Sequence, residues 1–223
     1  MQFRHEWKQE INAADRLALL ARLSAVMRPD PHAPGGSYQI RSLYFDSPAD
    51  TALREKLDGV NCREKFRLRF YNGDPSYIVL EKKSKLNGLC AKQSCRVSED
   101  EARRLAAGDD AWLLDPARPL CTELYSKARS QGLGPKTIVD YTREPFVFAP
   151  GNVRVTLDRD IRTGEFRTDF LNPETLTLPA GESPIILELK WDAFLPDLIR
   201  DAVALPGRRV TAFSKYAQCR IYG

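Results

Sequence analysis

The segment 63–72, REKFRLRFYN, alternates long cations with apolar side chains, and this alternation restricts how the chain can fold. Successive residues of a strand point to opposite faces. One face of this strand therefore carries Arg63, Lys65, Arg67 and Arg69. The other face carries Glu64, Phe66, Leu68 and Phe70. Same-face neighbours lie about 7 Å apart, twice the rise per residue, so the cationic face needs anions to offset its repulsion and the apolar face needs burial.

Seven further segments alternate in a similar way and are bounded by turn-forming Gly, Pro, Asn and Asp. They span residues 3–11, 38–46, 76–85, 89–98, 136–148, 153–161 and 184–192. Short loops at 72–75 (Asn-Gly-Asp-Pro) and 149–152 (Ala-Pro-Gly-Asn) favour antiparallel pairing of the strands they join. A solvated sheet surface would explain any single charged face. Long cations recur on at least five strands, however, and this recurrence favours a shared anion site.

Helical patterns occupy the intervening segments. Asn12 is expected to cap the first helix, Ser47 the second with Pro48 at its first position, and Ser98 with Glu101 forms a capping-box pattern for the third. Helices are expected over residues 12–27, 47–59, 98–108, 119–132, 195–207 and 213–221. No linker rich in Pro, Gly or Ser divides the chain. We therefore predict a single α+β domain over residues 1–223.

Eight antiparallel strands can close into a barrel, and its lumen need not be apolar. The apolar faces would then point outward beneath the helices, and the cationic faces would line the lumen. We predict a closed eight-stranded antiparallel β tunnel barrel with helices packed on the outside. Arg and Lys in such a lumen match phosphate oxygens. A single carboxylate among them is explained if it holds a divalent metal that bridges phosphate oxygens.

Composition excludes several classes of protein. Net charge is only +4, from 34 Lys and Arg against 30 Asp and Glu, which does not mark a nucleic-acid or membrane-surface protein. No apolar run approaches the roughly 18 residues of a membrane span, and the start has no signal-like apolar region, so we expect a cytoplasmic protein. Five cysteines without a C-x-x-C pair, beside two histidines, favour reduced thiols over a zinc site.

An ordered set of motifs resembles a known family. The set is Arg4-x-Glu6-x-Lys8, SLYFDSP at 42–48, Lys65-x-Arg67-x-Arg69-x-Tyr71, Glu81-x-Lys83, VRVTLD at 153–158, ELK at 188–190 and FSKY at 213–216. It resembles the VTC domain, the polyphosphate polymerase branch of the triphosphate tunnel metalloenzymes, or CYTH-like superfamily. The resemblance covers nearly the whole chain. It implies a tunnel that binds a triphosphate, and transfer of the terminal phosphoryl group of ATP onto inorganic polyphosphate with Mn²⁺ or Mg²⁺.

The resemblance also implies roles for individual residues. Those expected to take part in catalysis are Arg67, Arg69, Lys83, Arg143 and Arg154. Those expected to bind substrate phosphates are Lys8, Lys65, Lys92, Tyr141, Lys190, Ser214 and Lys215. Glu188 is the expected metal ligand, which places the Glu188 and Lys190 side of the last strand in the lumen.

Several assignments stay open from the sequence. Lys190 could neutralise Glu188, and Lys65 could lie at the rim of the tunnel. Glu6 and Glu81 could pair with cations or contact metal, and Asp158 could join Glu188 or orient Arg154. Arg4 stands where hydrolytic relatives carry a first glutamate, which favours the polymerase over a two-metal triphosphatase.

Three other functions compete with the polymerase. A triphosphatase would use water in the same tunnel, and a polyphosphate-binding module would lack catalysis. A single-stranded nucleic-acid binder would interleave aromatics with the cations, but Phe66 and Phe70 fall on the opposite face. The expected partners are ATP or another nucleoside triphosphate and inorganic polyphosphate, without nucleic acid or a membrane span. Oligomeric state is left open.

Overall fold

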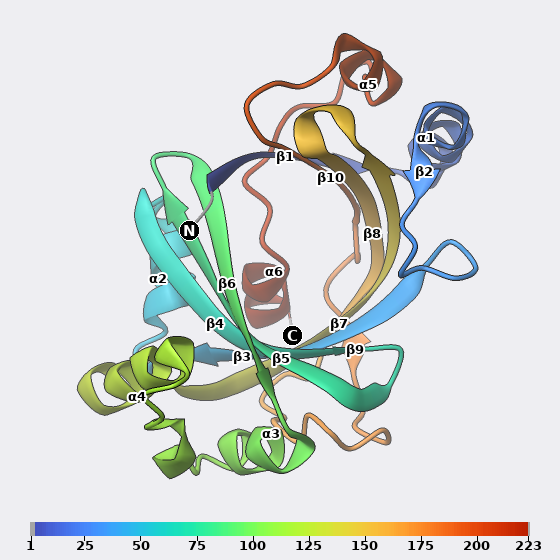
Figure 1. The fold of residues 1–223 in the computed structure, drawn as a ribbon. Helices are drawn as coiled ribbons and strands as arrows, with labels where there is room; N and C mark the ends of the chain where they lie inside the picture. Colours follow the sequence, from blue (N-terminus) through green and yellow to red (C-terminus); the bar gives the residue numbers. More distant parts are fainter. Residues whose placement is uncertain (1–2, 223) are drawn as a thin grey trace.

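Eight antiparallel strands close into a ring in the computed structural model, which describes residues 3–222. The ring runs β7-β3-β4-β5-β6-β1-β10-β8, and pairing of β8 with β7 closes it (Figure 1). Its strands are β1 (Phe3–Ile11), β3 (Tyr38–Asp46), β4 (Cys62–Tyr71), β5 (Asp74–Leu86), β6 (Leu89–Val97), β7 (Gly134–Phe148), β8 (Val153–Thr163) and β10 (Ile185–Trp191). The predicted closed antiparallel tunnel of an α+β protein is confirmed.

Two short strands extend the sheet and were not predicted. β2 (Arg28–Pro29) pairs with β7, and β9 (Leu178–Pro179) pairs with β8. Two residues are too few to show an alternation of faces, so the sequence carries no signal for them.

The helices are α1 (Ala13–Val26), α2 (Thr51–Leu57), α3 (Glu99–Ala106), α4 (Pro119–Gln131), α5 (Asp197–Ala202) and α6 (Lys215–Ile221). Two 3₁₀ turns are η1 (Ala111–Leu113) and η2 (Pro150–Asn152). Figure 1 shows α1, α3, α4 and α5 around the outside of the ring. α6 packs against α2, β7 and β8. Its Tyr216 ring stacks on the ring of Tyr44, which lines the lumen, with the two ring centroids 5.0 Å apart.

The predicted N-caps are correct for two of three helices. Asn12 and Ser98 each form a complete capping box. The second prediction is wrong: α2 begins at Thr51, not around Pro48. Asp46 at the end of β3 accepts the backbone N–H groups of Ala52 and Leu53 at 2.8 and 3.1 Å, and Ser47 Oγ accepts that of Thr51 at 3.1 Å, so the buried carboxylate and the serine together satisfy the first turn of α2.

The hydrophobic packing lies mainly between the ring and its covering helices. In β4, Phe66, Leu68 and Phe70 are buried in one such cluster with Leu105 of α3 and Leu124 of α4. A second cluster joins α1 and α5 to β8 and β10. The apolar faces of the strands therefore hold the outer shell together, which leaves their charged faces for the lumen. Within residues 3–222, no helix is long and apolar enough to cross a membrane.

A cation-lined tunnel as the candidate site

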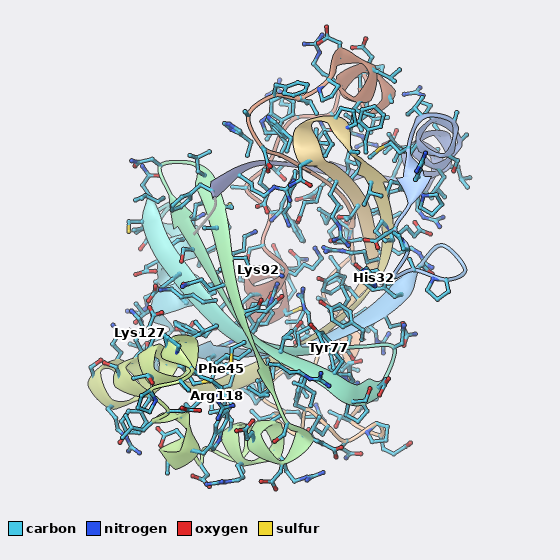
Figure 2. All side chains as sticks on the ribbon, viewed as in Figure 1. His32, Phe45, Tyr77, Lys92, Arg118 and Lys127 are labelled. Carbon is cyan, nitrogen blue, oxygen red and sulfur yellow. The ribbon has the colours of Figure 1, made fainter. Side chains whose placement is uncertain are left out.

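The ring encloses a cavity of about 490 Å³ lined by fourteen Lys and Arg side chains and three glutamates. That leaves 20 of the chain's 34 Lys and Arg, and 27 of its 30 Asp and Glu, elsewhere in the molecule. Every residue that the sequence assigned to the site lies in this lining: Lys8, Lys65, Arg67, Arg69, Lys83, Lys92, Tyr141, Arg143, Arg154, Glu188, Lys190, Ser214 and Lys215. In Figure 2, Lys92 lies on the wall of the ring, whereas Lys127 lies on α4 outside it.

Glu81 of β5 organises one group of cations. Its side chain is buried and accepts from Arg67 Nε at 2.8 Å and from Lys92 Nζ at 3.0 Å, with Arg69 Nη1 at 3.5 Å. Burial alone would raise the pKa of Glu81, but Arg67, Arg69 and Lys92 outweigh it and hold the pKa well below its usual range. Tyr44 accepts a further bond from Arg67 Nη1 at 2.7 Å. Glu81 therefore fixes the guanidinium orientations.

Glu6 of β1 and Glu188 of β10 pair with a second group of cations. Lys8 Nζ lies 3.1 Å from Glu6 Oε1 and 3.4 Å from Glu188 Oε2. Lys83 contacts Glu6 at 2.6 Å, and Lys190 pairs with both carboxylates. Burial opposes ionisation of Glu188, but the lysines prevail and its pKa lies well below the usual range. Lys190 is thus paired with Glu188 in this arrangement.

Asp158 of β8 pairs with a third group of cations, to which Arg154 does not belong. It accepts from Arg143 Nε and Nη2 at 2.6 and 2.7 Å and from Lys215 Nζ at 2.5 Å. Arg154 instead pairs with Asp30 at 2.7 Å. Burial would raise the pKa of Tyr141, whose ring lies under Lys215, but Arg143 and the neighbouring cations lower it. Of the two roles that the sequence left open for Asp158, orientation of Arg154 does not occur in this arrangement, in which Asp158 orients Arg143 and Lys215.

Four lining cations form no ion pair with a carboxylate among residues 3–222, although the charge of Arg63 acts on nearby Glu55: Lys56, Arg63, Lys65 and Lys85. Lys65 Nζ bonds Ser214 Oγ at 3.1 Å and lies 5.1 Å from the Tyr216 ring centroid. Burial and the nearby charges of Lys8 and Lys83 lower the pKa of Lys65 to about 7.

Sequence reasoning missed part of this set. Lys85 of β5 lines the lumen, although it is not among the residues that the sequence assigned to the site. Lys56 was missed because it comes from α2 and not from a strand. Lys82 does point away from the lumen, where it is buried beneath α4 and pairs with Glu64 at 2.9 Å and with Glu123.

The segment before α6 carries residues 211–215 into the cavity wall. It runs beside β1, where Thr211 N donates to Lys8 O at 2.7 Å and Val210 bridges Gln9. Ser214 caps α6 by accepting from Ala217 N at 3.3 Å. This path explains how Ser214 reaches Lys65 of β4, 149 residues earlier in the chain, and how Lys215 reaches Asp158 of β8, 57 residues earlier.

Two of the lumen carboxylates, Glu6 and Glu188, lie close enough together to suit a divalent cation. Within residues 3–222, no group of three or more His, Cys, Asp or Glu is placed to hold a metal. Glu6 and Glu188 do lie together, because Lys8 bridges them. Two carboxylates suit Mg²⁺, which takes its other ligands from substrate phosphates and water. Arg4, in place of a further carboxylate, pairs with Asp192 at 2.7 Å.

A sequence model of the VTC domain matches residues 3–222. The chain belongs to the VTC domain family. No curated protein matches this VTC domain. Its fold is similar to that of PH1012 from Pyrococcus horikoshii OT3, with a TM-score of 0.54 at 12% identity over 97% of this chain and 99% of that one. A candidate adenylate cyclase from Bacillus halodurans has a TM-score of 0.52 at 14% identity over 85% of this chain and 80% of that one.

The VTC family and the tunnel fold together support a function on triphosphates or polyphosphate. Enzymes of the tunnel class generally use divalent metals. The lumen chemistry agrees with both statements, since a dense set of fixed cations is suited to a substrate with several adjacent phosphates.

Proposed function

We propose that this VTC domain is a metal-dependent polyphosphate polymerase, which transfers the terminal phosphoryl group of ATP to a growing inorganic polyphosphate chain inside the tunnel. One observation carries this choice. The four carboxylates in and beside the lumen, Glu6, Glu81, Asp158 and Glu188, are all held in ion pairs with Lys or Arg, and those cations lower their pKa values. A carboxylate with a lowered pKa is a weak base.

The weak bases favour phosphate over water as the acceptor. Water must lose a proton as it attacks, and the lumen offers no carboxylate suited to accept it. The terminal phosphate of a polyphosphate chain is already ionised at neutral pH and needs no base. One of its oxygens would form a bond to the γ-phosphorus in line as the bond to the bridging β–γ oxygen breaks, and ADP would leave with that electron pair.

The cations would supply positioning and charge neutralisation. Arg67, Arg69, Lys83, Arg143 and Arg154 would contact the oxygens that gain negative charge, with their guanidinium and ammonium groups already oriented by carboxylates and tyrosines. Lys8, Lys65, Lys92, Tyr141, Lys190, Ser214 and Lys215 would hold the rest of the phosphate chain. Glu188, with Glu6 beside it, would hold Mn²⁺ or Mg²⁺, which neutralises further phosphate charge when bound.

The distribution of charge argues against nucleic acid as the substrate. A nucleic-acid surface needs cations that a bulky strand can reach, whereas here they gather in the cavity, and acidic residues outnumber basic ones in the rest of the chain. A cytoplasmic location and a single domain over residues 1–223 remain predictions.

The test is to incubate the purified protein with ATP and Mn²⁺ or Mg²⁺, with and without a short polyphosphate primer, and to resolve the products by ³¹P NMR. We expect growth of internal-chain phosphate signals, which Glu188→Ala abolishes. Glu174→Ala, an exposed glutamate that leaves the lumen intact, is the matched control and should retain activity. Orthophosphate as the sole product would replace the polymerase by a triphosphatase. Retained polyphosphate binding without turnover would make the domain a binding module.

A further inference from the structure

Two of the five cysteines touch each other outside the tunnel. The Sγ atoms of Cys95 on β6 and Cys121 on α4 lie 3.8 Å apart. Cys121 is buried in the hydrophobic cluster between the ring and its helices, and Cys95 packs against that cluster. The other three lie elsewhere: Cys90 lines the lumen, Cys62 is exposed on β4, and Cys219 is buried on α6. All five are free thiols.

Strand alternation explains why Cys95 meets α4 and does not face the lumen. Lys92 and Cys95 are three residues apart on β6, so their side chains point to opposite sides of the sheet. Lys92 lines the lumen, and Cys95 contacts Cys121 in the first turn of α4. Glu123 on the same helix pairs with Lys82 of β5. The helix is therefore fixed to the tunnel wall with one thiol placed directly over the other.

The contact is close to the geometry of a disulfide. Bonded sulfur atoms lie about 2.05 Å apart. From 3.8 Å, each sulfur has to move by only about 0.9 Å to reach that distance. The two thiols come from different elements, so a bond between them would join α4 to the wall covalently.

The surroundings give the two thiols different roles. Cys95 is half-buried, whereas Cys121 is completely buried. Burial, together with the neighbouring Cys95, raises the pKa of Cys121 to about 12. A small oxidant in solution therefore meets Cys95 first, and Cys121 stays a thiol until a reactive sulfur forms beside it.

We propose that Cys95 and Cys121 are a site of oxidative modification, at which a hydroperoxide converts the two thiols into a disulfide that links α4 to β6. With hydrogen peroxide, the sulfur of Cys95 attacks one peroxide oxygen, the O–O bond breaks, and a sulfenic acid and one water result. The sulfur of Cys121 then attacks the sulfur of Cys95, and the S–O bond breaks. The hydroxyl group leaves as a second water with the proton of Cys121. The two thiols lose two electrons and two protons in all, and the peroxide is reduced to two waters.

The disulfide should stabilise the tunnel wall. It would connect residues 26 apart and close a loop that contains α3 and η1, which restricts the unfolded chain. Cys95 lies opposite Leu80, and its neighbour Ser94 lies opposite Glu81, the carboxylate that orients Arg67. The link therefore acts on the part of the wall that holds this group. The inference is independent of the proposed polymerase activity.

The test treats the purified protein with hydrogen peroxide and compares it with protein kept in dithiothreitol. Four proteins are used: the wild type, Cys95→Ser, Cys121→Ala, and Cys62→Ser as the matched control at an exposed cysteine. Trypsin cleaves between the two thiols, so the disulfide would join peptides 93–96 and 105–127. Mass spectrometry of the unreduced digest detects that pair, and thermal unfolding measures its effect on stability.

Peroxide should join these two peptides in the wild type and in Cys62→Ser, and should raise their melting temperatures by about 5–10 °C. Dithiothreitol should reverse both changes, which requires no substitution at the buried site. Cys95→Ser and Cys121→Ala should show neither change. Three results would overturn the inference: a dimer linked through Cys62 as the main product, Cys95 oxidised to a sulfinic acid without the link, or a link that leaves the melting temperature unchanged.

Discussion

Lys65 makes a quantitative prediction about phosphate binding and pH. Its pKa of about 7 comes from burial and from surrounding cations, and it lies well below the ordinary value of 10.5. A bound phosphate chain supplies the missing negative charge and should restore that pKa to near or above its ordinary value. The charges that lower this pKa most are those of Lys8, Lys83, Arg63 and Lys56, and the side chain also contacts Ser214 and Tyr216. The nearby carboxylate of Glu6 is already paired with Lys8 and Lys83.

The expected proton uptake follows from these two pKa values. At about pH 8, one unit above the free pKa, roughly a tenth of the molecules carry a charged Lys65. In the complex nearly all would, so binding of a linear polyphosphate chain should take up about 0.9 proton at this group. The same linkage should weaken binding about tenfold between about pH 6 and about pH 8.

The assay is calorimetry in two buffers of different ionisation enthalpy, which reports the protons taken up. The ligand also titrates in this range, so Lys65→Arg is the matched control, since arginine keeps its charge throughout. Wild type should take up about 0.9 proton more than Lys65→Arg at about pH 8. Equal uptake by the two proteins would refute the reasoning.

The free protein provides an independent check. A lowered lysine pKa imposes its full cost on folding below about pH 7, where Lys65 is charged in both states. Between about 7 and 10.5 the unfolded chain binds more protons than the folded one, so this group's contribution to stability rises with pH. Lys65→Met should therefore raise the melting temperature more at about pH 6 than at about pH 9.

Three further substitutions test other contacts. Asp158→Asn leaves Arg143 and Lys215 without their buried counter-charge and should cost about 3–5 kcal/mol in urea unfolding; a loss below about 1 kcal/mol would contradict the paired geometry. Arg67→Ala should reduce turnover in the ³¹P assay by at least about a hundredfold while the circular dichroism spectrum is kept; wild-type activity in this variant would exclude the assigned role. Tyr216→Phe removes the 2.5 Å bond to Asp46 and should lower unfolding free energy by about 1–3 kcal/mol, and an unchanged melting curve would show that this bond contributes little.

Alternation along single strands was enough to predict the tunnel wall. In β4 the sequence fixes Arg67 and Phe66 on opposite sides, and a closed ring leaves one inside and one outside. Local patterns also located the caps Asn12 and Ser98, whose partners lie three residues away. Both kinds of feature can be predicted because they depend on residues close together in the sequence: the strand faces on a period of two residues, and the caps on a partner three residues away.

Pairing across the lumen could not be read from the sequence. Asp158 could have oriented Arg154, which lies four residues earlier on the same face of β8, yet it bonds Arg143 on the neighbouring strand and Lys215, the first residue of α6. Asp46 likewise accepts the backbone N–H groups of Ala52 and Leu53, and so shares the first turn of α2 with Ser47, which accepts that of Thr51. Which partner a carboxylate bonds depends on how segments from different parts of the chain approach one another in the fold. The periodicity of a single sequence carries no information about that approach.

The separation of charge between the lumen and the rest of the molecule affects how this protein would coexist with a long polyanion. A protein with cations spread over its surface would adsorb such a polymer, link into aggregates with it and lose its free sites. Here, with Asp30, Asp158 and Asp192 set aside as partners of lumen cations, 24 Asp and Glu still oppose 20 Lys and Arg outside the lining. The exterior should therefore repel polyphosphate, and high polymer concentrations should leave the protein dispersed, with the chain threaded through it and not wrapped around it.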